Sequence, residues 1–341
     1  MNECTQIKQE YIKTPADSLK KLGNQSNLEH MTFSSGGGPA IQCVKPTDNP
    51  AHRQEAEAAE KALTDILTGI NLAEMKAGTE TLDKGYELMD FYEHLKYYIK
   101  ALIDDNLIAQ IQKISTEVIM LDAERLASHG KIGMGAALSK AEQLMDERGG
   151  GSQTLLGIRP QPLLKPNPSM GTDGSKEKPK VKSESQVKWE AANKRMFEQA
   201  TDSGLKIAPD ALRKFIEELA TIIQKEGISF YRKNEIGEDF LPMDKIETAF
   251  QQFCIDLSES MVKISAGEEN PIVVASRIWD DFTRIHPFSD GNGRVRSLLI
   301  DYVLICSELP PFLPIMKPDD RTANKRIRMI TSGIKRSMIS K

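Results

Sequence analysis

Cysteine is scarce in this chain and gives no sign of a covalent or metal framework. The 341 residues include four cysteines, which lie far apart at Cys4, Cys43, Cys254 and Cys306. No Cys-x-x-Cys pair occurs, so the sequence argues against a cysteine-rich zinc site and against a domain held together by disulfides. Isolated cysteines of this kind are typical of proteins from a reducing compartment.

Long apolar runs and an excess of one charge are also missing. No stretch approaches the roughly 20 apolar residues that span a bilayer, and residues 1–13 lack the apolar core of a secretory signal peptide. Basic and acidic residues nearly balance, at 45 and 49, so no overall field marks a partner such as nucleic acid or a membrane surface. We therefore expect no membrane span and no clear nucleic-acid site.

The N-terminal half contains two kinds of sequence. Residues 1–48 carry Pro and Gly clusters without sustained apolar periodicity, which predicts an irregular N-terminal segment. Over residues 49–148, apolar side chains recur at three- and four-residue steps, as at Leu88, Phe91 and Leu95. This spacing predicts a separate helical module, which is a candidate for docking a target protein.

A change of composition then separates this module from the rest of the chain. Residues 149–186 hold five prolines and six glycines, and such a segment buries too little apolar area to offset its ordering entropy. We predict a flexible linker there. Residues 187–341 return to mostly helical spacing, interrupted at 227–236 by an alternating pattern that favours a short β-hairpin.

The residues that carry chemistry lie between two helical patterns of this second module. Positions 286 to 294 are His-Pro-Phe-Ser-Asp-Gly-Asn-Gly-Arg, and helical spacing resumes at Val295. This order predicts a helix, a tight turn and a second helix. The free N–H groups and positive dipole end of that second helix attract anions, and glycine lets the backbone approach a phosphate closely.

The side chains of this turn suit the transfer of a phosphate-bearing group. Asn292 can adopt a left-handed conformation, and Arg294 can form forked bonds to phosphate oxygens. Asp290 is a hard oxygen ligand of the kind that Mg²⁺ uses together with water and phosphate. His286, the only histidine after residue 187, is suited to accept a proton from an attacking hydroxyl. A lone histidine is usually structural, and Asp-Gly-Asn-Gly is a common turn, but the combination favours a catalytic site.

At these positions the sequence resembles a known family. His-Pro-Phe-x-Asp-Gly-Asn-Gly-Arg is similar to the signature of Fic-domain proteins, also called Fido proteins, with eight of nine positions specified. The resemblance extends over about residues 205–325, where the stretch at 230–242 is similar to the family's substrate-aligning flap. It does not cover residues 1–200. It implies an all-α fold with a short β-hairpin flap, which here follows the separate helical module.

The resemblance also implies an activity and a role for each matching residue. Members mostly are protein adenylyltransferases, which use Mg²⁺ and transfer AMP from ATP to a Ser, Thr or Tyr hydroxyl of a target protein. His286 would be the general base, Phe288 a structural anchor and Asp290 the metal ligand. The phosphates would be bound by four consecutive residues: Gly291, Asn292, Gly293 and Arg294. By analogy with bacterial effectors, the protein would act in the cytoplasm, or in a host cell after translocation without a cleaved signal peptide.

Two departures from the family pattern keep other functions open. The family motif usually has a second arginine three positions after the first, but Ser297 stands there and the next arginine, Arg296, comes one position early. At 100° per residue, Arg296 points about 200° away from Arg294. Asn324 lies where relatives often have tyrosines. The alternatives are a Fic-fold transferase with another donor, of the UTP or CDP-choline type, and a catalytically silent Fic-fold binding module.

Many relatives restrain themselves with a Ser/Thr-x-x-x-Glu-Gly/Asn helix whose glutamate pairs with the second arginine. Thr221 with Glu226 and Gly227 comes close to this pattern but is one residue too long. We expect no restraint of this kind.

Overall fold

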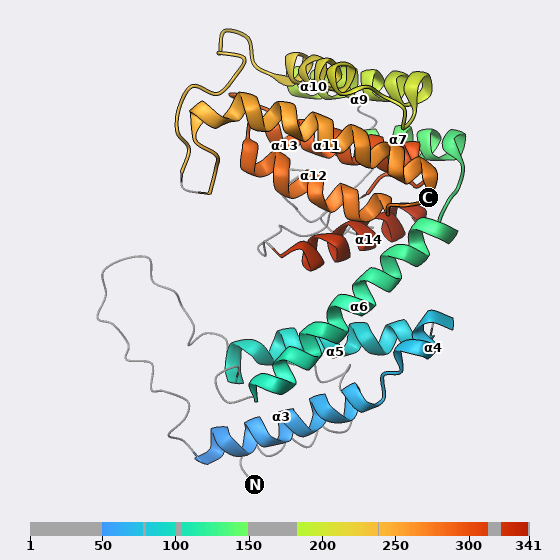
Figure 1. The fold of residues 1–341 in the computed structure, drawn as a ribbon, viewed down its shortest axis with the longest axis vertical. Coiled ribbons are helices and arrows are strands. Elements are labelled where there is room, and N and C mark those ends of the chain that lie inside the picture. The colour runs from blue at the N-terminus through green and yellow to red at the C-terminus, as the bar shows by residue number, and fades with distance from the viewer. Residues whose placement is uncertain are drawn as a thin grey trace, which may run out of the picture. The chain divides into compact units, whose positions relative to one another are not determined.

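The computed structural model describes residues 50–77, 80–99, 104–148, 183–237, 239–312 and 322–339. Every regular element in these ranges is a helix, so the prediction of an all-α protein is confirmed (Figure 1). None of the helices described is long and apolar enough to cross a membrane. The predicted irregular segment at 1–48, and nearly all of the predicted linker at 149–186, lie outside the described residues.

The chain forms two compact units, residues 1–121 and 122–341. The described helices of the first unit are α3 (Pro50–Thr68), α4 (Leu72–Ala77), α5 (Glu80–Ile99) and the first part of α6 (Asp105–His129). α3 packs on α5, and the core between them and α6 includes Leu63, Leu88, Phe91 and Ile111. Phe91 therefore belongs to the core of this unit.

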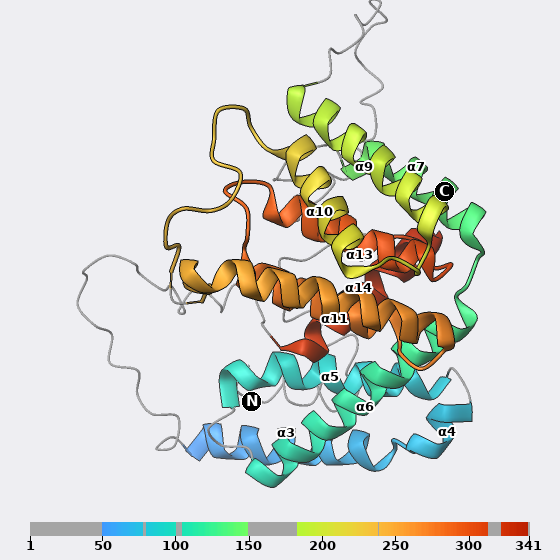
Figure 2. The same cartoon turned by 45° about the horizontal axis from the view of Figure 1, so that its top comes forward.

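The second unit is a bundle around one central helix. Its elements are the end of α6, α7 (Met134–Arg148), α9 (Glu184–Ser203), α10 (Pro209–Ile223), the 3₁₀ turn η3 (Met243–Lys245), α11 (Ile246–Ala266), α12 (Pro271–Ile285), α13 (Asn292–Cys306) and α14 (Ala323–Ile339). α13 contacts α12, α10, α9 and α7, and Figure 2 shows α9 and α10 together on one side of it.

α13 is central because it is apolar on nearly every side. Twelve of its fifteen residues are buried, including Leu298, Ile300 and Val303, which point in different directions around the helix. A helix without a polar face loses most by facing water and so takes the middle of a bundle. Its first turn follows the His-Pro-Phe turn directly, so the core of the unit fixes the start of the candidate site.

The boundary between the units lies within α6, earlier than composition suggests. α7, which the sequence analysis included in the N-terminal helical module of residues 49–148, packs against α9 and α13 of the second unit. Between residues 134 and 144 its buried residues are Ala137, Ala141 and Leu144, and Ile132 just before it donates a backbone hydrogen bond to the carbonyl of Glu308 at 2.8 Å. Small alanines carry little sequence information about which core they join.

Standard capping residues define the end of α11 and the start of α12. α12 begins with Pro271 after an Asn270 cap, whose side chain accepts a hydrogen bond from the N–H of Ile272, and this combination is typical of helix starts. α11 ends at Gly267 in the left-handed conformation, with φ of 74°, where glycine avoids the strain of a Cβ. The two helices therefore turn sharply and pack side by side.

The β-hairpin predicted between α10 and α11 is not present in the part of this segment that the structure describes, residues 224–237 and 239–242. One isolated antiparallel bridge joins Tyr231 to Phe288 instead. The returning arm also bonds elsewhere, because the N–H of Leu241 donates to the carbonyl of Arg284 at 2.9 Å. Each arm thus pairs with the end of α12 or the turn after it, and the two do not pair with each other.

Candidate active site

His286 caps the C-terminal end of α12 in a strained conformation. Its φ and ψ are 47° and 58°, a left-handed region that few residues other than glycine adopt. The N–H of His286 still donates to the carbonyl of Phe282 at 3.0 Å. Its ring lies edge-on to Phe240, with centroids 5.0 Å apart. The turn therefore directs the imidazole away from the helix and against the segment that precedes η3.

The surroundings of His286 favour a neutral ring. Its pKa is lowered mainly by burial, then by the positive charge of Arg232, and less by Arg296, while a hydrogen bond to the backbone of Thr283 acts in the opposite direction. Burial and a like charge both disfavour the imidazolium form. A neutral imidazole at pH 7 has a free lone pair and can accept a proton.

Phe288 and Asn292 hold the turn after His286 in place. The Phe288 ring is fully buried and packs against four aromatic rings, those of Phe230, Tyr231, Phe250 and Phe282. The Phe288 N–H donates to the Asn292 side-chain oxygen at 3.0 Å, and the Asn292 side-chain nitrogen donates to the Phe288 carbonyl at 2.7 Å. These reciprocal bonds fix the distance between His286 and the start of α13.

The left-handed residue of the turn is Gly291, and not Asn292 as the sequence analysis supposed. Gly291 has φ of 81° and precedes α13, whose start has no side-chain cap. The N–H groups of Arg294 and Val295 both donate to the Gly291 carbonyl. The first two N–H groups of the helix, those of Asn292 and Gly293, have no earlier turn of helix to bond. They make the start of α13 a suitable place for an anion.

The two glycines of the turn meet different surroundings, which gives a testable contrast. A Cβ on Gly291 would lie 2.6 Å from Cγ2 of Ile223, whereas a Cβ on Gly293 would meet nothing within 4 Å. We expect Gly291→Ala to lower the free energy of unfolding by about 1 to 3 kcal/mol, through backbone strain and overpacking. Gly293→Ala should leave it unchanged or slightly higher, because alanine favours the helix. Urea denaturation measures both, and equal effects would contradict the geometry.

Asp290 and Arg294 form an ion pair at the mouth of this turn. Nη2 of Arg294 donates to Oδ2 of Asp290 at 3.2 Å, and the side chains are 13% and 34% exposed, respectively. This single bond leaves most of the five guanidinium N–H groups of Arg294 for another acceptor.

The donor set suits Mg²⁺ only as a partner of phosphate. Within the described ranges there is no group of three His, Cys, Asp or Glu side chains that would hold a metal by themselves. One partly exposed carboxylate, Asp290, fits a Mg²⁺ ion that takes its other ligands from phosphate and water. The residues present therefore fit a magnesium nucleotide better than a resident metal ion.

Neither Ser297 nor Arg296 provides a second exposed cation at the start of α13. Ser297 is buried, and its hydroxyl donates to the Gly293 carbonyl at 3.1 Å. Arg296 faces α12: its guanidinium lies 3.6 Å from the centre of the Trp279 ring and donates to the Thr283 hydroxyl at 2.6 Å. Burial lowers the pKa of Arg296 to about 10.

A segment that the sequence analysis overlooked has the spacing of the family's inhibitory helix. Ser265, Glu269 and Asn270 match Ser/Thr-x-x-x-Glu-Gly/Asn. They lie between α11 and α12, at the opposite end of α12 from His286, and Glu269 forms an ion pair with Arg277 on α12. The motif spacing is therefore present, but its glutamate pairs with an arginine of α12, far along that helix from His286.

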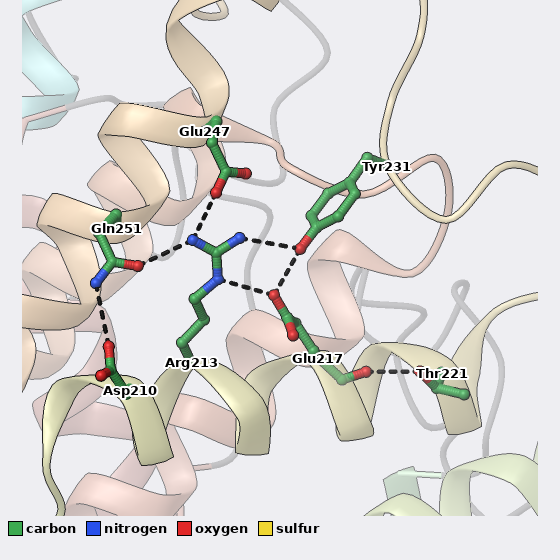
Figure 3. A network of polar contacts seen from close by, with 7 residues as sticks. All are labelled: Asp210, Arg213, Glu217, Thr221, Tyr231, Glu247 and Gln251. Atoms are coloured by element: carbon green, nitrogen blue, oxygen red, sulfur yellow. Dashed lines mark hydrogen bonds and ion pairs between the residues drawn. The ribbon is translucent and has the colours of Figure 1, made fainter.

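Sequence reasoning also missed the side chains that anchor the segment before η3. The hydroxyl of Tyr231 donates to Oε1 of Glu217 at 2.5 Å. Arg213 donates to the same Glu217 oxygen at 2.9 Å and pairs with Glu247 of α11 at 2.7 Å, so the network joins α10 to α11 and to Tyr231 (Figure 3). The i to i+4 spacing of Arg213 and Glu217 was visible in the sequence, but nothing local indicated Tyr231 as their partner.

The helices and the turn now described match a known family. The model of the Fic/DOC family matches residues 206–304, which run from just before α10 to near the end of α13. This stretch is therefore a Fic-family domain, and the resemblance predicted from the sequence is confirmed. Proteins of this family are commonly transferases that act on nucleotide donors.

Solved structures similar to this chain are distant. A Fic-domain signalling protein from Bacteroides thetaiotaomicron is 15% identical, with a TM-score of 0.42, over 66% of this chain and 94% of that one. Fic-1 (residues 134–508) from C. elegans is 15% identical, with a TM-score of 0.40, over 84% and 98%. IbpAFic2, solved covalently tethered to Cdc42, is 13% identical, with a TM-score of 0.41, over 88% and 100%. No curated protein matches the chain.

Proposed function

We propose that this protein is a protein adenylyltransferase, which transfers AMP from ATP to a hydroxyl side chain of a target protein with Mg²⁺. The observation that carries the proposal is the fixed arrangement of His286 beside an uncapped helix start, held together by the reciprocal Phe288 and Asn292 bonds. A base next to an anion site is the pair of elements that hydroxyl attack on a phosphate requires.

Each residue of the turn has a separate task in this proposal. His286, kept neutral by burial and nearby arginines, accepts the proton of the Ser, Thr or Tyr hydroxyl, whose oxygen attacks the α-phosphate of ATP while pyrophosphate leaves. The backbone of Gly291, Asn292 and Gly293 and the guanidinium of Arg294 bind the phosphates and offset their charge. Asp290 is the protein ligand of Mg²⁺, which when bound with the nucleotide neutralises phosphate charge.

Incubation with several donors tests the reaction class directly. Purified protein is mixed with Mg²⁺ and ATP, UTP or CDP-choline, and its intact mass is measured, since such transferases can be expected to modify accessible hydroxyls of their own chain. We expect a mass increase that corresponds to AMP, from ATP alone. An adduct of a different mass would mean that the protein uses a donor other than ATP. The absence of any adduct, also on proteins of a cell extract, would contradict the proposal.

One observation favours a second donor class. Ser297 is buried and Arg296 is stacked on Trp279, so neither supplies the second arginine that grips a terminal phosphate in relatives. A donor of the CDP-choline type has no terminal phosphate to grip. In the donor comparison this alternative predicts an added phosphocholine group and no adduct from either triphosphate.

Gly293→Ala tests where the phosphates bind. Because a Cβ at this position meets no protein atom, the substitution should leave the fold intact, yet the methyl group would occupy the space next to the first N–H groups of α13. We expect weaker donor binding, by roughly tenfold or more, in a calorimetric titration with ATP and Mg²⁺. Unchanged affinity in a stably folded variant would mean that phosphate binds elsewhere.

A further inference from the structure

Arg232 is a buried arginine whose bonds converge on the end of α12. Its side chain is 3% exposed. Nε donates to the His286 carbonyl at 3.1 Å, and Nη2 donates to the carbonyls of Leu241 and Ile285 at 2.6 and 3.4 Å. Its own backbone N–H donates to the Pro287 carbonyl at 3.0 Å. Three consecutive carbonyls, those of residues 285–287, thus accept hydrogen bonds from one residue.

These acceptors explain how a charged group is tolerated in this place. The carboxylate near Arg232, that of Glu235, is 3.7 Å away and largely exposed, so its contribution is weak. The C-terminal end of a helix carries partial negative charge on its last carbonyls, which attract a cation. Arg232 therefore satisfies the end of α12, and α12 in turn stabilises the buried guanidinium.

The residue that these bonds hold is the one in strained geometry. His286 has φ of 47°, a conformation that costs a non-glycine residue on the order of 1 kcal/mol or more. Such a conformation persists only when the surroundings fix it, and the carbonyls on both sides of the His286 Cα, those of Ile285 and His286, are bonded to Arg232.

We propose that Arg232 is a positioning residue for His286: it fixes the left-handed turn at the end of α12 and thereby the direction of the imidazole, which packs against Phe240. The proposal deepens the function proposed above and rests on the role of His286 as the base. Arg232 also bonds the carbonyls of Asn234 and Leu241, so the same side chain holds both arms of the segment before η3 against the catalytic turn.

The neighbouring residue anchors this segment from the opposite side. Tyr231 forms the backbone bridge to Phe288, and its hydroxyl bonds to Glu217 and Arg213 of α10 (Figure 3). Burial and Glu217 raise the pKa of Tyr231, so the hydroxyl stays protonated as a donor near neutral pH. With Tyr231 fixed on α10, the adjacent Arg232 enters the end of α12 from a defined direction.

The positive charge of Arg232 has a second, measurable effect. The charged groups whose fields act on His286 are Arg232 on this segment and Arg296 on α13, and both lower its pKa, after burial as the largest cause. Loss of Arg232 should therefore raise the pKa of His286. Because the neutral ring is the proton acceptor, the acid limb of the activity profile should move to higher pH by the same amount.

Two substitutions of Arg232 separate position from charge, and a third removes an arginine that lies away from the turn. Arg232→Met removes the charge and the forked bonds, whereas Arg232→Lys keeps the charge and loses the fork. Arg195→Met is the control, because Arg195 also forms an ion pair, with Glu218 of α10, but lies away from the turn on α9. The His286 ring is titrated by NMR in the full-length protein, with His286→Asn to assign its signal.

We expect Arg232→Met to raise the pKa of His286 and to lower the transfer rate by about 10- to 100-fold, with Arg232→Lys intermediate in rate but with a smaller change in pKa. Arg195→Met should change neither. An unaltered His286 pKa in Arg232→Met would overturn the inference, and so would full activity. If Arg232→Met does not fold, an Arg232→Lys protein of parental rate and pKa overturns it equally. If the parent protein shows no transfer activity with any donor, the proposed function is refuted. A His286 pKa that is shifted in Arg232→Met would still support the positioning role.

Discussion

Transfer activity is expected to disappear when His286 is replaced by alanine. Removal of a general base costs about 100-fold or more in rate. The His286 side chain is only partly buried and caps α12 at the edge of the core, so the fold should persist. The measurement is the rate of adduct formation by intact mass, with circular dichroism as the check on folding.

A second variant at the same position separates loss of the base from strain in the backbone. Alanine, like most residues, is strained at φ of 47°, whereas asparagine tolerates the left-handed region and cannot act as a base at neutral pH. His286→Asn should therefore be at least as stable as His286→Ala and equally inactive. Activity close to that of the parent in either variant would remove His286 from the mechanism.

The largest loss of stability is expected from Phe288→Ala. The ring is fully buried, and its centroid lies 5.2 Å from that of Phe230 and 5.7 Å from that of Phe250. Removing a buried phenyl ring costs about 3 to 5 kcal/mol. The same change loosens the turn between His286 and Gly291, so activity should fall further than the fraction unfolded would explain.

Tryptophan fluorescence isolates this effect. The two tryptophans of the chain, Trp189 and Trp279, both lie in the second unit, on α9 and α12, so the signal follows the unfolding of this unit in urea. Phe288→Leu keeps most of the apolar volume and should lose clearly less stability. An unfolding midpoint unchanged by Phe288→Ala would show that the ring does not anchor the turn.

The local parts of the candidate site could be predicted from the sequence, since they depend on short-range patterns. The helix, turn and helix around residues 286–294 follow from apolar spacing and two glycines, and the direction of Arg296 follows from helical geometry alone. The left-handed residue was assigned to Asn292 because composition does not distinguish it from Gly291. The close approach of Ile223, 68 positions earlier in the chain, also excludes a side chain at position 291, and no local pattern indicates that contact.

Features that depend on distant partners could not be predicted. The alternating pattern at 227–236 favoured a hairpin, but Arg232 and Leu241 bond to the end of α12 and leave no pairing between the arms. The position of α7 was missed for a similar reason, because its buried face consists largely of alanines. At 227–236 the local pattern also fails on burial, because Ile228 and Ile236 are exposed and Arg232 is buried. In both cases the pattern is silent about the partner.

The placement of α7 determines where the chain can be cut to obtain a folded domain. The family match begins at residue 206, and a fragment chosen from it, or from the start of α9, would lack Ala137, Ala141 and Leu144 and leave part of α9 and α13 uncovered. Uncovered apolar surface of this kind promotes aggregation during expression. A fragment that begins with residue 122 keeps α7 and the ion pair of Asp122 with Lys335 of α14, and is the better choice for expression of the second unit.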